Sequence, residues 1–227
     1  MIFDPLYLVI LGVGFVLSLG AQFWVKSAVK KWSQVRTSRG MTGREVAEAI
    51  LRARGIHGVK VEPVQGFLSD HYDPSSRTLR LSPDIYNGRS VSAAGIAAHE
   101  VGHAIQHQDG YLPMKLRQKM VPVANIGTSL GIWVTIAGIF IGIMELATLG
   151  VLLFGAAVAF TIVTLPVEFD ASARAKKVLL GQGLVTGEEA RGVSKILNAA
   201  AATYVAAAVA SVLQLLYWAY RAGLLRR

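Results

Sequence analysis

The sequence predicts a mainly α-helical integral membrane protein, with about four transmembrane helices and a smaller polar part that contains helices and strands. Two observations predict this class. Apolar residues make up 53% of the 227 residues and charged residues only 16%, whereas an average soluble domain has about 25% charged residues. Four stretches without any charge each approach the roughly 20 residues that cross a bilayer as a helix: 7–25, 121–143, 146–165 and 199–220. This composition excludes a disordered tail and a typical soluble enzyme.

The first apolar stretch has an alternative interpretation as a cleaved signal peptide. The residues before it carry no positive charge and include Asp4, and apolar residues continue past the small-x-small triplet at 18–20. Lys26, Lys30 and Lys31 follow on the C-terminal side. These features favour a retained anchor whose N-terminus lies outside. The fourth stretch is rich in alanine, and we expect it either to span or to pack obliquely against the other helices.

Lysine and arginine set the predicted orientation. Basic residues cluster after the first span, before the second and after the third, while the turn between the second and third spans carries none. By the positive-inside rule, residues 26–120 and 166–198 lie in the cytoplasm. If the fourth stretch spans, the arginines at the C-terminus lie outside, which is the one conflict with this topology: Arg221, Arg226 and Arg227.

The expected organisation therefore has five segments. The net charge of +9 fits this topology and attraction to anionic lipid; the polar part has no basic–aromatic stripe, so nucleic acid is not an expected partner. Cysteine is absent, which excludes disulfides, cysteine-bound zinc and thiol catalysis. The segments are an N-terminal anchor (1–25), a cytoplasmic domain (26–120), a transmembrane hairpin (121–165), cytoplasmic helices (166–198) and a C-terminal apolar helix that is expected to span the membrane (199–227).

The polar segments contain recognisable helix and strand signals. Capping boxes at 42–45 and 186–189 each predict the start of a helix, the first of which runs to about Arg54 and stops at Gly55. Ser90 is expected to cap another helix that runs to about His107. Three short strands of an antiparallel sheet are predicted, with turn residues between the last two and a loop after them: strands 59–61, 66–72 and 78–81, turn 73–76, loop 83–88.

The segment with the clearest chemistry is H-E-x-x-H, formed by His99, Glu100 and His103. Four residues are close to one helical turn, so the two imidazoles share a face of the helix and can meet one Zn²⁺ at about 2.0–2.1 Å. Glu100 lies one position round, where it can reach a metal-bound water without binding the metal. Because the neighbouring residues are small or apolar, burying these three polar groups without a partner would be costly. The sequence therefore predicts one zinc ion per chain.

A zinc site of this kind needs a third protein ligand. His107 is on the same helix face, but a straight helix is poorly shaped to supply three ligands, so we expect His107 at the rim. Pro166 suits a first helical position, which places Glu168 and Asp170 in the first turn of a new helix; only one can face the metal. Either acid could instead interact favourably with the helix dipole at the helix N-terminus. Arg174, at i+4, could form an ion pair with Asp170.

Several motifs in this order resemble the YugP-like family of bacterial membrane zinc metallopeptidases, and more distantly the HtpX-type and CAAX prenyl membrane proteases: 69–74, 79–83, 86–90, 99–107 and 166–172. In the HtpX type a later helix supplies E-x-x-x-D, whose Glu is the third ligand. The resemblance implies that Glu168 takes this position. Ser172 stands where the pattern has Asp, which leaves Asp170 or another residue to fill the supporting role. The implied cytoplasmic domain is an α+β zincin-like domain with a short antiparallel sheet.

The expected function is that of a membrane-embedded zinc metalloendopeptidase of the inner (plasma) membrane, with its active site on the cytoplasmic side. A zinc-activated water would attack the peptide bond with Glu100 as general base. Tyr204, His107 and His71 are candidates for stabilising the oxyanion or supporting the site. Expected partners are the lipid bilayer and a peptide or protein substrate, membrane proteins included; the hairpin could offer an edge strand to an extended peptide.

Two other functions compete with this one. A zinc-binding membrane protein could bind peptides or regulate a partner without cleaving them, but the intact set of His99, Glu100 and His103 favours an enzyme. The other is a transporter or a purely structural membrane protein. A transporter would require polar residues inside the spans, and these offer only Asn125, Gln214 and a few hydroxyls.

Overall fold

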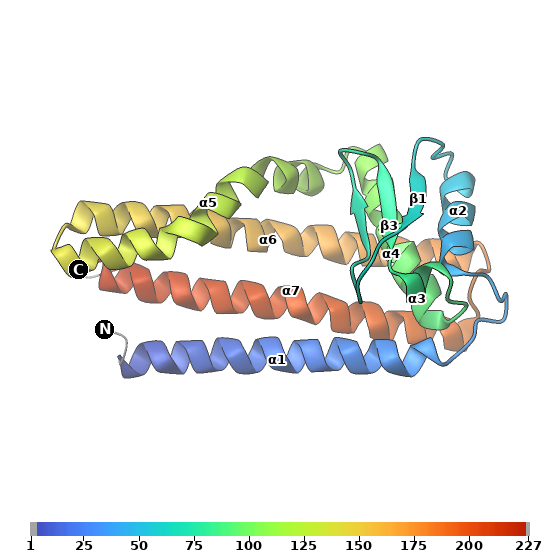
Figure 1. Cartoon of the computed structure of the whole chain (residues 1–227), viewed down its shortest axis with the longest axis horizontal. Coiled ribbons are helices and arrows are strands. Elements are labelled where there is room, and N and C mark those ends of the chain that lie inside the picture. Colours follow the sequence, from blue (N-terminus) through green and yellow to red (C-terminus); the bar gives the residue numbers. More distant parts are fainter. Residues whose placement is uncertain (1–3, 226–227) are drawn as a thin grey trace. The chain divides into compact units, whose positions relative to one another are not determined.

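The computed structural model describes residues 4–225, and within this range the chain is mainly helical with a three-stranded sheet (Figure 1). Met1, Ile2 and Phe3 of the predicted anchor, and the C-terminal Arg226 and Arg227, lie outside the described residues. The helices are α1 (Pro5–Ser33), α2 (Gly43–Ala53), α3 (Pro83–Tyr86), α4 (Val91–Gln108), α5 (Leu112–Ile141), α6 (Met144–Gly181) and α7 (Gly187–Arg221); the strands are β1 (Lys60–Pro63), β2 (His71–Asp73) and β3 (Thr78–Leu81).

Four of these helices, α1, α5, α6 and α7, are long and apolar enough to cross a membrane. Helices α1, α6 and α7 each contain one of the four uncharged stretches found in the sequence, and α5 contains the second up to Ile141. Large apolar side chains on them stay exposed in the isolated chain, among them Phe15, Phe23, Trp133 and Phe140. Such side chains are unfavourable in water and favourable in hydrocarbon. The prediction of four apolar helices of membrane-spanning length is therefore confirmed.

The chain divides into two compact units. Unit 1 comprises the residues up to 21, residues 115–166 and those from 202 onward, and unit 2 comprises 22–114 and 167–201. The sequence-based division into five segments follows a different principle, the membrane topology, and stays a prediction.

Unit 1 is built from apolar helical segments that pack closely. A Cβ atom on Gly131 of α5 would lie 2.6 Å from the backbone nitrogen of Phe154 in α6. The absence of a side chain therefore lets the two backbones touch, as small residues do in membrane helix pairs. Near the N-terminus, Asp4 accepts hydrogen bonds from the Tyr217 hydroxyl at 3.0 Å and from Arg221 at 2.7 Å, which ties the start of α1 to the end of α7.

Unit 2 has the main buried core of the described chain. The predicted capping box is present at α2, where the Thr42 hydroxyl accepts from the Glu45 amide and the Glu45 carboxylate accepts from the Thr42 amide. Gly55, with φ +67°, follows the helix end as predicted. The inward side of α2 packs against α4 and includes Val46 and Ile50, both with about 1% exposure or less.

The sheet differs from the predicted antiparallel arrangement. Its strand order is β1-β3-β2, in which β2 is antiparallel to β3 but β1 is parallel to β3. Strand β3 lies between the two earlier strands. The segment between Pro63 and His71 leads from β1 to the far edge of the sheet, and the β2–β3 hairpin then places β3 beside β1. Local sequence signals predicted three strands in these regions, but strand order depends on long-range packing that they do not report.

Two other local predictions were wrong. Residues 83–88 were expected to be a loop, but Pro83 begins the short helix α3, where its missing N–H costs nothing at a first helical position. Pro166 was expected to begin a new helix, but α6 runs through it without interruption. Proline removes one backbone hydrogen bond from a helix interior, and the rest of this 38-residue helix continues on both sides. Glu168 and Asp170 consequently lie inside α6 rather than in a first turn.

Candidate metal centre

Helix α4 carries the H-E-x-x-H residues through the core of unit 2. Ser90 caps it as predicted, since its hydroxyl accepts a hydrogen bond from the Ala93 amide at 3.1 Å. Most of its 18 residues are buried, and the apolar ones are small or β-branched. Neighbouring elements therefore approach this helix closely, and polar groups on it need partners within the protein.

The structure brings His99, His103 and Glu168 together. The Nε2 atoms of His99 and His103 lie 3.2 and 3.6 Å from Oε2 of Glu168, and the three potential ligand atoms all lie within 4.8 Å of one another. Glu168 is 2% exposed and His103 7% exposed. A buried carboxylate that faces two imidazoles is thus present at the position that the sequence singled out.

This cluster fits a zinc ion. Two atoms bound to one tetrahedral Zn²⁺ at about 2.0–2.1 Å lie roughly 3.3 Å apart, close to the observed separations of 3.2 and 3.6 Å. Two imidazole nitrogens and one carboxylate oxygen are ligands that zinc accepts, and three protein ligands leave a fourth position open for water or substrate. The donor set and its spacing therefore suit a catalytic type of zinc site.

Hydrogen bonds on the far side of each imidazole hold the ring in a suitable orientation. Nδ1 of His99 lies 3.2 Å from the Ser172 hydroxyl, and Nδ1 of His103 lies 3.0 Å from Oε1 of Gln106. If each Nδ1–H donates to its partner, each Nε2 lone pair is free for a metal. Ser172 is therefore placed to support His99, although the resemblance had left this position open.

Gln106 is a residue that the sequence analysis missed. Its side chain is fully buried, and its amide nitrogen donates 2.8 Å hydrogen bonds to the Val167 carbonyl and to Oδ2 of Asp170. A buried glutamine three residues after His103 on an apolar helix was the available signal, because such an amide must find partners. Gln106 thereby joins His103 of α4 to the backbone and side chains of α6.

Asp170 faces this network and not the His–His–Glu cluster. Its Oδ2 accepts a hydrogen bond from Nε of Arg174 at 2.5 Å, which is the i+4 pair considered from the sequence. Arg174 also pairs with Asp109 and lies over the ring of Tyr111. Of the two acids left open by the spacing, Glu168 is therefore the one that lies with the histidines.

Glu100 is buried beside the cluster but contributes no atom to it. Burial by itself lowers the pKa of His103, but a hydrogen bond with Glu168 and the negative charges of Glu100 and Glu168 outweigh burial and raise this pKa. Burial raises the pKa of Asp70, and the charge of Glu100 adds to this effect. The charge of Glu100 therefore reaches His103, one of the candidate ligands.

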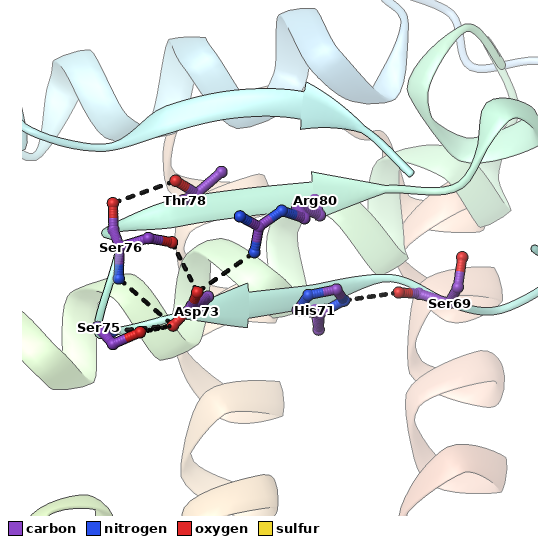
Figure 2. Close-up of polar contacts among 7 residues, drawn as sticks. All are labelled: Ser69, His71, Asp73, Ser75, Ser76, Thr78 and Arg80. Atoms are coloured by element: carbon purple, nitrogen blue, oxygen red, sulfur yellow. Dashed lines mark hydrogen bonds and ion pairs between the residues drawn. The ribbon is translucent and has the colours of Figure 1, made fainter. Parts of the chain in front are cut away.

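The remaining candidates occupy other places. His107 lies one turn beyond His103, where its Nδ1 is 2.9 Å from the Tyr72 hydroxyl. His71 is exposed on β2, with its ring bonded to the Ser69 carbonyl at 2.8 Å, as Figure 2 shows. Tyr204 belongs to α7 in unit 1. Neither His71 nor His107 joins the cluster, and an oxyanion role for Tyr204 stays a prediction.

Gly102 permits the approach of α6 to α4 beside the candidate metal ligands. A Cβ atom on Gly102 would lie 2.6 Å from the Ala171 carbonyl oxygen and 3.1 Å from its Cα. These are backbone atoms of α6 that cannot move independently of the helix. The glycine between the two histidines therefore sets the spacing at which Glu168 meets them.

Comparison with known proteins agrees with this site. The family described as "putative neutral zinc metallopeptidase" matches residues 7–223, so the chain belongs to this family. One relative is the "putative membrane protease YugP" of Bacillus subtilis (strain 168), which is 48% identical over 211 residues, or 93% of each chain. No solved structure matches the chain.

The Gly102→Ala variant tests the close approach of the two helices. The added methyl group should push α6 away from α4 and weaken zinc binding by roughly tenfold or more, as changes behind metal ligands commonly do. Zinc content after purification, together with a competition titration against a chelator, would measure this. The control is Gly95→Ala on the same helix, where the new Cβ would lie 3.3–3.6 Å from the side chain of Val193 and meet no backbone atom among its three nearest neighbours. Equal zinc binding by both variants would contradict the role given to Gly102.

Zinc affinity should also depend on pH. Because the raised pKa of His103 favours its protonated form in the metal-free chain, and zinc requires a neutral ring, binding must displace this proton. The apparent affinity should therefore rise as pH increases from about 6 to about 8. Titration with a competing chelator at several pH values would measure this rise. An affinity that stays constant across the range would contradict it.

Proposed function

We propose that this membrane protein is a zinc-dependent metalloendopeptidase. The observation that carries the proposal is the buried cluster of His99, His103 and Glu168, with Glu100 beside it. Family membership and the relationship to a protein called a membrane protease support a peptide as substrate. His99, His103 and Glu168 would hold one zinc ion per chain through two nitrogens and one oxygen.

When bound there, zinc would polarise the scissile carbonyl and make a water molecule acidic enough to attack it near neutral pH. Glu100 would accept a proton from the attacking water and would later return it to the leaving amine. Its burial on the same helix as two of the ligands supports this role. Ser172 and Gln106 hold the imidazole rings in orientation, and the buried surroundings limit access of other water molecules.

The proposed location is the inner membrane, with the metal centre on the cytoplasmic side. The basic residues that flank the uncharged stretches of α1, α5 and α6 support this orientation through the positive-inside rule. All three candidate ligands belong to unit 2, whose sequence is polar compared with the apolar helical segments of unit 1. An N-terminus on the outer side follows from the same argument.

Glu100→Gln tests the enzymatic role. The variant should keep its zinc and lose about 10²–10⁴-fold in hydrolysis, because an amide cannot accept the proton. Purified full-length chain in detergent would be assayed with casein, and zinc content measured in the same samples. Glu62→Gln, an exposed substitution on β1, is the matched control. Unchanged hydrolysis by Glu100→Gln would remove Glu100 as the base; zinc-bound wild type without hydrolysis would favour the non-proteolytic zinc protein.

Glu168→Ala tests the third ligand. Loss of one of three protein ligands should reduce bound zinc to a small fraction of the wild-type content. Asp170→Asn is the comparison, since this neighbouring acid faces Gln106 and Arg174 and should retain most of the metal. Metal analysis of both purified variants decides the matter. Full zinc in Glu168→Ala would show that a different residue binds the ion.

A further inference from the structure

A cavity lies along α4, one helical turn beyond His103 of the candidate metal centre. Its volume is about 350 Å³, and all of its lining residues belong to unit 2. His107, one of the lining residues, follows His103 by four positions, which is about 6 Å along a helix. We call this space the His107 cavity; its polar side chains come from His57, Tyr72, Arg77, His107 and Gln108.

The polar side chains that line the His107 cavity can all donate hydrogen bonds, and no lining residue is acidic. Arg77 is a fixed cation, and in the described part of the chain no carboxylate pairs with it. Its guanidinium folds toward Gly58, on which a Cβ would lie 3.6 Å from Nη1. The backbone of Arg77 is held in the left-handed region at φ 49°, and its carbonyl accepts from the Lys60 amide at 3.1 Å. The turn therefore fixes the position of the Arg77 backbone, from which the charged side chain extends.

The nearest acid of the hairpin is already engaged. Asp73 accepts hydrogen bonds from the hydroxyls of Ser75 and Ser76, both at 2.6 Å, and pairs with Arg80 at 3.3 Å (Figure 2). These contacts, the serine hydrogen bonds first, hold the pKa of Asp73 well below its usual range. Asp73 therefore closes the hairpin turn, and Arg77 is left to face the cavity without a partner of opposite charge.

The Tyr72–His107 pair adds a donor whichever way its proton lies. If the Tyr72 hydroxyl donates to Nδ1 of His107 across the 2.9 Å contact, Nε2–H of His107 has no further partner among the described hydrogen bonds. If Nδ1–H donates instead, the Tyr72 O–H is the unused donor. One donor of the pair is thus available in either tautomer, beside the guanidinium of Arg77.

We propose that the His107 cavity binds a carboxylate of the peptide substrate, with Arg77 and the Tyr72–His107 pair as its ligands. This inference rests on the proposed peptidase function. An extended peptide covers about 3.3–3.6 Å per residue, so a chain held at the metal centre reaches the cavity within about two residues. The carboxylate belongs either to the C-terminus of the peptide or to an acidic side chain near the cleaved bond. The substrate class is therefore peptides that carry a negative charge about two residues from that bond.

The test measures binding without hydrolysis. Zinc-loaded, full-length Glu100→Gln in detergent micelles is titrated with one fluorescent pentapeptide in three forms: a free C-terminal acid, its C-terminal amide, and the amide with a glutamate as last residue. Fluorescence anisotropy gives each Kd. In the same background, Arg77→Gln removes the charge, Arg77→Lys keeps it, and Arg54→Gln removes an exposed charge elsewhere. Thermal melting confirms that each variant is folded.

The acid should bind about tenfold or more tightly than the amide, as hydrogen bonds to charged groups allow. Arg77→Gln should abolish this preference, while Arg77→Lys and Arg54→Gln should retain most of it. Tight binding of the glutamate form would identify a side chain as the second source of the carboxylate. Equal binding of all forms, or a preference that survives Arg77→Gln, would overturn the proposal. Hydrolysis of casein by the wild type would then still support the peptidase function by itself.

Discussion

The contact between α4 and α6 at Glu168 is the interaction on which the candidate site depends. A carboxylate that is 2% exposed loses nearly all of its hydration, and two imidazoles of α4 replace the water. The backbones can come this close because Gly102 presents no side chain to Ala171. Any change in the separation of these helices would alter both histidine distances to Glu168 together, since both rings belong to one rigid helix.

A network of hydrogen bonds and ion pairs extends outward from this contact. Gln106 uses its oxygen for His103 and its nitrogen for the Val167 carbonyl and Asp170, so both ends of its amide are engaged. The same network continues through Asp170 to Arg174 at the more exposed end. A buried polar network that is fully hydrogen-bonded favours one arrangement over its alternatives. The orientation of His103 is consequently determined from two helices at once.

Features that depend on residues close together in the sequence, such as helix caps and apolar helices, were predicted well. The capping residues Thr42 and Ser90 begin helices as expected, and uncharged stretches gave the long apolar helices. His99 and His103 followed from helical spacing, whereas Glu168 over Asp170 needed the resemblance to a known family. Predictions that depended on distant packing were wrong or absent: the parallel pairing of β1, the unbroken helix at Pro166, and the part taken by Gln106.

Strand β2 is an edge strand of the sheet, which has a consequence for solubility and assembly. An edge strand exposes unpaired backbone amides and carbonyls, and long, flat edge strands can pair with strands of other molecules. Strand β2 has only three residues, and the bonds of Asp73 close its hairpin immediately afterwards. The other edge strand, β1, has four residues, so both edges of the sheet offer few backbone groups to a strand from another molecule.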